Sequence, residues 1–532
     1  MSLQRVLGAL ALAAFLWLPV AAPGQDTPRF AIRGYQVEGN SLLPPDQVSL
    51  AVMPFTGPKS SFDTIQLALE ALEKAYLKAG YGSVKIEIPE QDLQEGVVRL
   101  LVVEARLDRV TVEGSKFRSE ANILRSMPAL VPGQVVNVDA LQSNLDLANE
   151  SFSKYTGVTF RQAEGSRLTD AVVRVNDDVP TRFLLSLDNT GSIPTGRYRL
   201  GFSYLNSNLF DRDHALSIQV LTSPTRFNNV GILGLGYRIP LYAMGGDSMD
   251  FTLGYSNVDS GRVDLFSVSG SGLIVGARYN QRLKPQGEWQ QRLSYSLDQR
   301  SYDSSVTLAA GGASLVPNLR VRPLGLTYNG NLRNAQRDLA ASVTVTRNIP
   351  GGSRGDSAAF NQPGARVGAD AAFTTLRYSA SFSERLSTDW SVRGAFNGQY
   401  TRDLLISGEQ FGVGGADSVR GFGEREVAGD RGIRVGLEVW GPDLGPRTGK
   451  AELRLQPIAF FDAGWVRYNL APGTITSQSI SSMGLGLRGS WARSASFKLD
   501  YGYVLDGAQN TGGNGASAKG NWRLHGSAMW VF

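Results

Sequence analysis

Two segments of the chain hold the charged residues with the clearest chemical signal. The first is SVRGFGEREVAGDRG, residues 418–432, in which Arg420 stands among glycines and a phenylalanine. The second is FFDAGWV, residues 460–466, in which Asp462 is flanked by aromatic and small side chains. A guanidinium removed from water needs a carboxylate partner, and the two groups can form a bidentate ion pair. The segments therefore suggest an Arg420–Asp462 pair, with two separately solvated charges as the alternative.

Residues that carry enzyme chemistry or bind metals are scarce. The chain contains two histidines, His214 and His525, and no cysteine, and neither histidine belongs to a cluster with metal-ligand spacing. In the last predicted strand, where side chains alternate between two faces, His525 shares a face with polar residues. We expect that face to point inward. The DRD segment at 211–213 lacks the glycine and distal glutamate of a calcium loop, so we expect a hairpin turn there. We expect no catalytic residue, no metal and no cofactor.

Composition and the N-terminus favour an exported protein. The 53 Lys and Arg and 48 Asp and Glu leave a charge of +5 without a lysine-rich tract, so we expect no nucleic-acid partner. Arg5 precedes an apolar run over 6–18, and small residues follow. This layout predicts a signal peptide over residues 1–24, because a membrane anchor would need a longer apolar run.

Residues 181–532 alternate between apolar and polar side chains. In FKLDYGYV, residues 497–504, aromatic and leucine side chains share one parity, and Lys498 and Asp500 have the other. A soluble β-sandwich alternates too, but these predicted strands are long enough to cross a bilayer obliquely, and their polar face is rich in glycine and charge. At about 22 residues per strand, the region predicts a membrane β-barrel of about 16 antiparallel strands.

The predicted barrel indicates where the two charged segments lie. Residues 406–432 lie between two predicted strands, either as an extracellular loop or folded back into the lumen. Asp462 has the opposite parity to Phe461, so it points inward if Phe461 faces lipid. Gly464 shares the inward parity and would leave room for an approaching loop.

The segment before the barrel contains an internal repeat. The tripeptide V-E-G occurs at 37–39 and 112–114, and each copy continues as a β-α-α-β-β unit. The predicted units cover residues 28–106 and 107–178, and each three-stranded sheet would leave a strand edge open for a partner. The apolar stripe of the second unit is made of Leu141, Leu145, Ala148 and Phe152.

Three groups of residues carry a family resemblance. Residues 419–422 resemble the VRGF/Y signature of the outer-membrane protein-assembly and two-partner secretion superfamily, and 460–464 resemble its F/G-x-D-x-G motif. Residues 409–432 are similar throughout to two-partner secretion transporters of the TpsB type (FhaC/ShlB/HecB-like). The repeated units resemble POTRA domains. The matching loop residues are Val419, Arg420, Gly421 and Phe422; those of the predicted barrel wall are Phe460, Asp462 and Gly464; the aromatic C-terminal signal would be Trp530 and Phe532.

The resemblance implies two periplasmic α+β POTRA domains followed by a barrel in the outer membrane of a Gram-negative bacterium. Residues 406–432 would be loop 6, with Arg420 contacting Asp462. Only residues 25–27 separate the predicted signal peptide from the first unit, so we expect no pore-plugging helix there.

The implied function is recognition of an unfolded TpsA-type exoprotein by the POTRA domains and its passage through the barrel, as in haemolysin or adhesin secretion and activation. Other implied partners are outer-membrane lipid, the barrel-assembly machinery and periplasmic chaperones. The alternatives are an assembly or insertion factor of the same superfamily, a passive pore, and a surface adhesin.

Overall fold

A computed structural model describes most of the chain after the predicted signal peptide. Residues 1–24 and the short segment 25–27 lie outside the described residues. The described ranges are 29–92, 95–162, 168–192, 195–227, 230–257, 261–263, 266–268, 271–303, 317–449, 452–470, 476–492, 494–509 and 517–532. The chain divides into two compact units. The first comprises Met1–Val110, Ala129–Leu141 and Phe160–Ala171, and the second Thr111–Pro128, Gln142–Thr159 and Val172–Phe532.

The first unit is built on a three-stranded sheet with the order β2-β5-β4, in which β2 and β5 are parallel. Helix α2 begins after Ser61 with a capping box, and its stripe of Ile65, Ala68, Leu72 and Tyr76 is buried in the core. The elements are β1 (Phe30–Ile32), β2 (Gly34–Glu38), α1 (Pro45–Val52), η1 (Met53–Phe55), β3 (Gly57–Ser60), α2 (Phe62–Lys78), β4 (Lys85–Glu87) and β5 (Val97–Val103).

A second three-stranded sheet has the order β6-β8-β7 and is divided between the two units. Its elements are β6 (Leu107–Glu113), α3 (Glu120–Arg125), α4 (Val138–Ala148), β7 (Lys154–Gln162) and β8 (Thr169–Asp177). The predicted helical stripe extends to Phe152, whereas α4 ends at Ala148. The reason is that the Asn149 side chain pairs with the backbone of Thr156, donating to its O (2.9 Å) and accepting from its N (2.6 Å).

The repeated V-E-G tripeptide has a backbone explanation. Gly39 and Gly114 have φ of +80° and +87°, a conformation that side chains disfavour. A Cβ at Gly39 would lie 2.4 Å from the carbonyl oxygen of Val102, and one at Gly114 would lie 2.3 Å from that of Val175. Both copies therefore end the first strand of a sheet with the same close approach to another strand.

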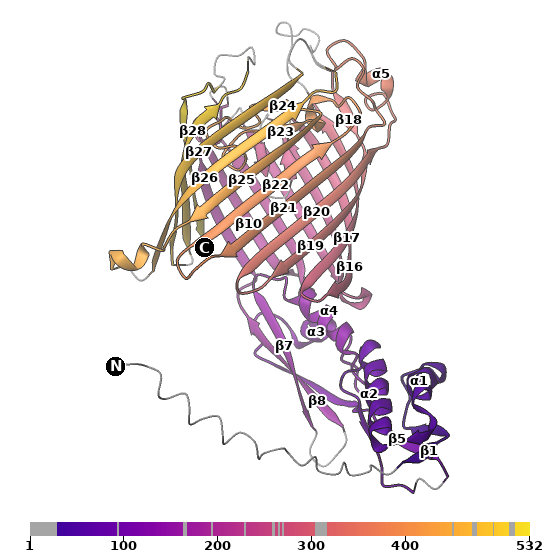
Figure 1. Cartoon of the computed structure of the whole chain (residues 1–532). Helices are drawn as coiled ribbons and strands as arrows, with labels where there is room; N and C mark the ends of the chain where they lie inside the picture. The colour runs from indigo at the N-terminus through magenta and orange to yellow at the C-terminus, as the bar shows by residue number, and fades with distance from the viewer. Residues whose placement is uncertain are drawn as a thin grey trace, which may run out of the picture. The chain divides into compact units, whose positions relative to one another are not determined.

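The rest of the second unit is a closed antiparallel barrel (Figure 1). Its strands follow one another in sequence order, and β9 pairs with β29 to close the ring. Both β18 and β19 pair with β17 and form one strand interrupted at Arg322, so the described residues make sixteen strands, as predicted. The strands are β9 (Thr181–Asp188), β10 (Arg199–Leu209), β11 (His214–Thr222), β12 (Gly231–Leu241), β13 (Asp247–Ser256), β16 (Gly272–Gln286), β17 (Trp289–Tyr302), β18 (Leu319–Val321), β19 (Pro323–Arg333), β20 (Arg337–Asn348), β21 (Thr374–Arg385), β22 (Ser391–Tyr400), β25 (Arg431–Trp440), β26 (Leu453–Arg467), β27 (Ser477–Trp491), β28 (Ala495–Asp506) and β29 (Trp522–Val531).

Shorter elements lie in the connections between the strands of the barrel. They are η3 (Tyr242–Met244), β14 (Gly261–Val263), β15 (Phe266–Val268), α5 (Ser357–Phe360), η4 (Ser407–Glu409), β23 (Phe411–Val413), β24 (Val427–Gly429) and η5 (Gly445–Thr448). None of the helices in the described ranges is both long and apolar enough to cross a membrane.

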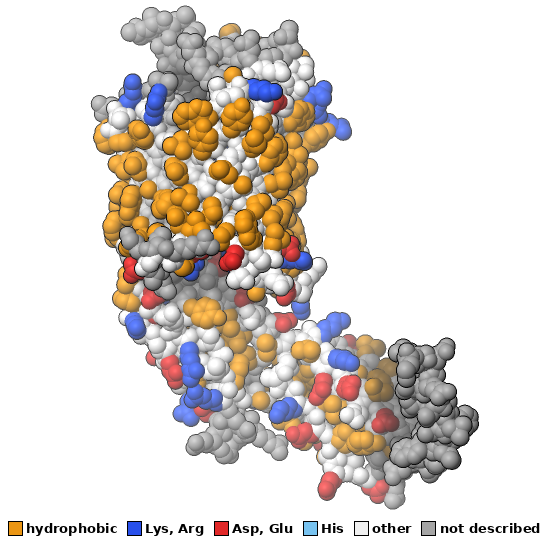
Figure 2. All heavy atoms as spheres, turned by 60° about the vertical axis from the view of Figure 1, so that its left-hand side comes forward, with side chains coloured by type: hydrophobic (Ala, Val, Ile, Leu, Met, Phe, Trp, Pro, Cys, Tyr) orange, Lys and Arg blue, Asp and Glu red, His pale blue; other side chains and the backbone are white. Residues whose placement is uncertain are grey.

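The outer face of the barrel is apolar. Figure 2 shows a broad band of hydrophobic side chains on the face of the barrel in view, with charged side chains gathered beyond its edges. Along β28, Leu499, Tyr501 and Tyr503 are exposed, whereas Asp500 between them is buried. This alternation is typical of a barrel with lipid outside and a polar interior.

The C-terminus closes the barrel at the end where β9 begins. The backbone of Phe532 donates to Phe183 O (2.9 Å) and accepts from Phe183 N (3.2 Å). Trp530 lies opposite Leu185 of β9, and the side chains of Trp530 and Phe532 are exposed on the outer surface. Both aromatic residues of the predicted C-terminal signal are thus on the closing strand or directly after it.

Candidate functional site in the barrel lumen

The long connection between β22 and β25 folds against the inner wall of the barrel. Within it, β23 and β24 pair as a small antiparallel sheet. An apolar cluster then joins this connection to strands β26, β27 and β28, and all its members are fully or almost fully buried. The cluster consists of Val413, Val419, Phe422, Val427, Val466, Ile480 and Val504. We call residues 406–432 loop 6, the range expected from the sequence, although β25 already begins at Arg431 and so includes the last two of these residues.

Arg420 at the tip of loop 6 forms a bidentate pair with Asp462 of β26. The Arg420 Nε donates to Asp462 Oδ2 at 2.6 Å, and Nη2 donates to Oδ1 at 2.9 Å. The backbone N of Arg420 also donates to Oδ2 at 3.2 Å. Arg420 is 4 % exposed and Asp462 is fully buried. Such a pair is both strong and directional, because two parallel N–H···O bonds fix the guanidinium plane.

Three further groups of the wall complete the binding site of the guanidinium. Nη1 of Arg420 donates to Glu438 Oε1 of β25 at 2.7 Å and lies 3.7 Å from Asp500 Oδ1 of β28. The guanidinium carbon lies 3.6 Å from the ring centroid of Phe460, a cation–π contact. Glu438 and Asp500 were not predicted from the sequence to belong to this site. Their inward parity was a usable signal, because each alternates with apolar residues on its strand.

Glycines make room for loop 6 at the wall. A Cβ at Gly464 would lie 2.2 Å from Val413 Cγ1, and one at Gly502 would lie 2.7 Å from the backbone N of Gly421. Gly421 itself has φ of +92°. Contacts this close leave no space for a side chain on either strand.

Gly464→Val is therefore expected to displace loop 6 without removing any charge. The new side chain would overlap Val413, and overpacking of this kind costs about 1–3 kcal/mol. In planar bilayers we expect larger single-channel conductance than wild type and longer open times. Ala463→Val, on the adjacent and partly exposed position, is the control. Equal conductance of the Gly464→Val and wild-type channels would contradict the idea that this glycine admits the loop.

His525 of β29 contacts the loop motif directly. The backbone N of Gly421 donates to His525 Nε2 at 3.1 Å, and His525 is 4 % exposed. Its Nδ1 has no hydrogen-bond partner among the described residues. The sequence predicted an inward-facing polar residue at this position, and the structure adds a contact with loop 6.

Loop 6 has a second charged anchor near its start. Glu409 accepts from Arg300 Nη1 (3.1 Å) and Tyr302 OH (2.6 Å) of β17 and from Arg377 Nη2 (3.2 Å) of β21. Glu409 is 2 % exposed. Loop 6 is therefore fixed to two separate parts of the wall, one through Glu409 and one through Arg420.

A third anchor lies at the end of loop 6. The fully buried Asp430 pairs with both terminal nitrogens of Arg366 and accepts from the backbone N of Leu405 (3.1 Å) and of Asn469 (2.8 Å). Neither Glu409 nor Asp430 was predicted from the sequence to be an anchor.

A buried ionic network lies at the turn between β10 and β11. Arg118 donates to Asp177 Oδ1 (2.5 Å) of β8 and to Asp213 Oδ1 (2.8 Å) of the turn. Lys154 of β7 pairs with Asp213, which also accepts from Tyr242 OH at 2.9 Å. Burial by itself would raise the pKa of Asp213, but the charges and hydrogen bonds of Lys154 and Arg118 lower it. The predicted DRD hairpin turn is present, and it takes part in a network that the sequence did not reveal.

In the described ranges, no group of three or more His, Cys, Asp or Glu side chains is placed to hold a metal ion. The buried charges of the lumen are engaged with one another across strands instead, as at Arg420 and Glu409.

Comparison with known proteins identifies the family. Residues 168–489 match the model "Haemolysin secretion/activation protein ShlB/FhaC/HecB", and residues 30–105 match "POTRA domain, ShlB-type". The outer membrane transporter CdiB of Dickeya dadantii is 24% identical over 427 residues, which are 76% of this chain and 71% of that protein. The hemolysin transporter protein ShlB of Serratia marcescens is 24% identical over 467 residues, or 84% and 79% of the two chains.

A solved structure shows the same fold. The structure of CdiB from Escherichia coli superposes with a TM-score of 0.76 at 18% sequence identity, covering 97% of this chain and 93% of that one. The family itself is shown by the model that matches residues 168–489: the chain belongs to the ShlB/FhaC/HecB family of haemolysin secretion/activation proteins.

Proposed function

We propose that this protein is the outer-membrane transporter of a two-partner secretion pair. It recognises an unfolded TpsA-type exoprotein in the periplasm and passes it through the barrel to the cell surface. The observation that carries the proposal is the buried Arg420–Asp462 pair, which holds loop 6 inside a closed barrel that follows a POTRA domain.

The proposed domains are a signal peptide at 1–24, POTRA domains at 28–106 and 107–178, and a barrel at 181–532 with loop 6 at 406–432. A second POTRA domain is supported by the β6-β8-β7 sheet with its helices α3 and α4. The equivalent positions of Gly39 and Gly114 against the neighbouring strands support it further. The exoprotein would add a strand to an open sheet edge of these domains.

Loop 6 limits the open width of the lumen until the exoprotein displaces it. Folding of the exoprotein outside the cell would make the net transport favourable, since a chain that has folded no longer fits the barrel. During biogenesis, Trp530 and Phe532 would be read by the barrel-assembly machinery after delivery by periplasmic chaperones, and the apolar outer face would contact outer-membrane lipid.

Deletion of the coding sequence followed by comparison of culture supernatants tests the function. We expect one large exoprotein to disappear from the supernatant while the other outer-membrane proteins keep their levels. A general loss of outer-membrane barrels would instead identify an assembly or insertion factor. Unchanged supernatants would point to a passive pore or an adhesin and would contradict the proposal.

A further inference from the structure

A cavity of about 640 Å³ lies where β29 loses its partner strand. The pairing of β9 with β29, here called the seam, extends only from Val531↔Leu184 to Ser527↔Asp188. Asn189 makes the last contacts along this edge: its backbone N donates to Gly526 O (3.2 Å), its side-chain Nδ2 donates to Leu524 O (2.8 Å), and its Oδ1 accepts from Gly526 N (2.9 Å). The first residues of β29, Trp522 to Leu524, therefore border the cavity on this side instead of another strand.

The cavity surrounds this edge from both sides of the barrel wall. Trp522 and Leu524 are exposed on the outer surface. Arg523, between them, belongs to the inward parity that includes His525, and Gly421 of loop 6 also borders the cavity. A group that enters from the outer surface can thus reach residues of the lumen.

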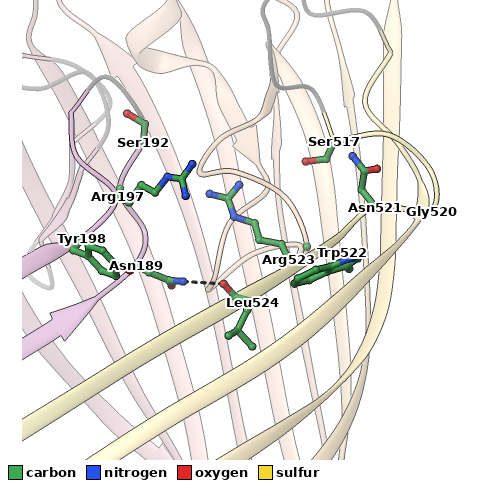
Figure 3. A pocket seen from close by; sticks show the side chains of 12 residues that line it. Asn189, Ser192, Arg197, Tyr198, Ser517, Gly520, Asn521, Trp522, Arg523 and Leu524 are labelled. Carbon is green, nitrogen blue, oxygen red and sulfur yellow. Dashed lines mark hydrogen bonds between the residues drawn. The ribbon is translucent and has the colours of Figure 1, made fainter.

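Two arginines converge in the cavity without a carboxylate between them. Figure 3 shows the guanidinium groups of Arg197, from the β9–β10 connection, and Arg523 directed toward one another. None of the described residues that line the cavity is acidic, and the residues that follow Ser192 and precede Ser517 in the sequence, 193–194 and 510–516, include no Asp or Glu. The nearby Glu426 accepts instead from Gly423 N (2.6 Å) and from Ser517 N (2.5 Å) and Oγ (2.9 Å).

Like charges that face each other favour a bound anion. The lining adds neutral polar groups, the hydroxyl of Ser192 and the amide of Asn521, whereas the hydroxyl of Ser517 already donates to Glu426. Two guanidinium forks with hydroxyl and amide donors match the several oxygens of a phosphate better than a single carboxylate.

The height of the cavity along the barrel axis favours a lipid headgroup as the source of that phosphate. Strand β9 starts directly after the periplasmic segment, so Asp188 and the antiparallel start of β29 lie toward the extracellular end. Aromatic side chains mark this level on the outer surface: Trp522 stacks on Tyr501 with ring centroids 5.4 Å apart, and Tyr198, another residue of the cavity lining, is exposed. Tryptophan and tyrosine gather at the level of lipid headgroups.

We propose that this cavity binds a phosphate group of an outer-leaflet glycolipid of the lipid A class, held between Arg197 and Arg523. The acyl chains would lie along the outer surface beside Trp522 and Leu524. The lipid would neutralise the facing arginines and cover the edge of β29 that Asn189 leaves unpaired. This site does not depend on which exoprotein is secreted.

Native mass spectrometry of the full chain in phosphatidylcholine nanodiscs containing bisphosphorylated lipid A tests the proposal. We expect wild type to retain lipid A and the Arg197→Ala/Arg523→Ala variant to retain it about tenfold or more weakly, since hydrogen bonds to charged groups are lost. The matched control is Arg347→Ala/Arg402→Ala, two exposed arginines outside the cavity. Equal retention by both double variants would overturn the site.

Measurements on the wild-type chain distinguish between the possible anions. They remain valid even if the double variant does not fold. We expect the wild-type chain not to retain fully dephosphorylated lipid A. If it retained this form as well as the bisphosphorylated form, the role of phosphate would be overturned. Inorganic phosphate that binds while lipid A does not would overturn the lipid source. In a separate variant that keeps both arginines, a photo-crosslinker in place of Tyr198, an exposed residue of the cavity lining, is expected to label lipid in cells. Labelling of the secreted exoprotein alone would overturn the proposal in favour of a site for acidic peptide.

Discussion

Arg420→Ala is expected to abolish secretion while leaving an assembled barrel in the outer membrane. The substitution leaves the buried Asp462 without the partner that satisfies both of its oxygens. Removing one member of a buried pair costs about 3–5 kcal/mol, which is more than about a hundredfold in the equilibrium between docked and undocked loop 6. Secretion is measured by immunoblot of culture supernatants, and assembly by the heat-modifiable mobility of the barrel.

Three further variants make this result specific. Asp462→Asn should behave like Arg420→Ala, because the amide offers a single acceptor oxygen. Arg420→Lys should retain part of the activity, because an ammonium keeps the charge but lacks the planar fork. Arg337→Ala, which removes the exposed pair with Glu384, should secrete normally because surface pairs contribute little. Wild-type secretion by Arg420→Ala would refute the role of this pair.

Arg118→Ala is expected to loosen the segment before the barrel from the β10–β11 turn. The variant leaves Asp177 and Asp213 buried with only Lys154 as a cation, a cost of about 3–5 kcal/mol. The native chain has no cysteine, so spin labels at Tyr155→Cys and Glu288→Cys report on the wild-type background. We expect a broader distance distribution between the labels and a loss of secretion comparable with that of Arg420→Ala.

The second network has its own control. Arg174→Ala removes an exposed ion pair with Glu113, both of whose side chains are more than half exposed. It should leave the label distances and secretion unchanged. A narrow, wild-type distance distribution in Arg118→Ala would show that the network does not hold the segment in place.

The fold was predictable because its signal repeats along the chain. Every strand that separates lipid from lumen must alternate, as Leu499, Asp500 and Tyr501 do. The Arg420–Asp462 contact was predicted from inward parity and from the two motifs together. Parity alone leaves open whether an inward residue reaches a given loop.

The other anchors depend on information that alternation does not carry. Glu409 meets Arg300 across 109 residues, and Arg118 meets Asp213 across 95. Such partners meet only when the stagger between strands brings them to the same height, and alternation defines the face of a strand but not its stagger. The cavity at the seam was not predicted from the sequence for the same reason. It arises because β9 ends at Asp188, opposite Ser527, and leaves the first residues of β29 without a partner strand on that side.

The anchors of loop 6 at Glu409 and Asp430 have a kinetic consequence. If only the Arg420 contact breaks, both ends of the loop remain fixed, and Gly414 and Gly415, with φ of +114° and +113°, can act as a pivot. The tip is then a tethered ligand of its own binding site, at an effective concentration on the order of millimolar. Each passing polypeptide would compete with this ligand, and the arginine would rebind without diffusion through the medium once the polypeptide has left.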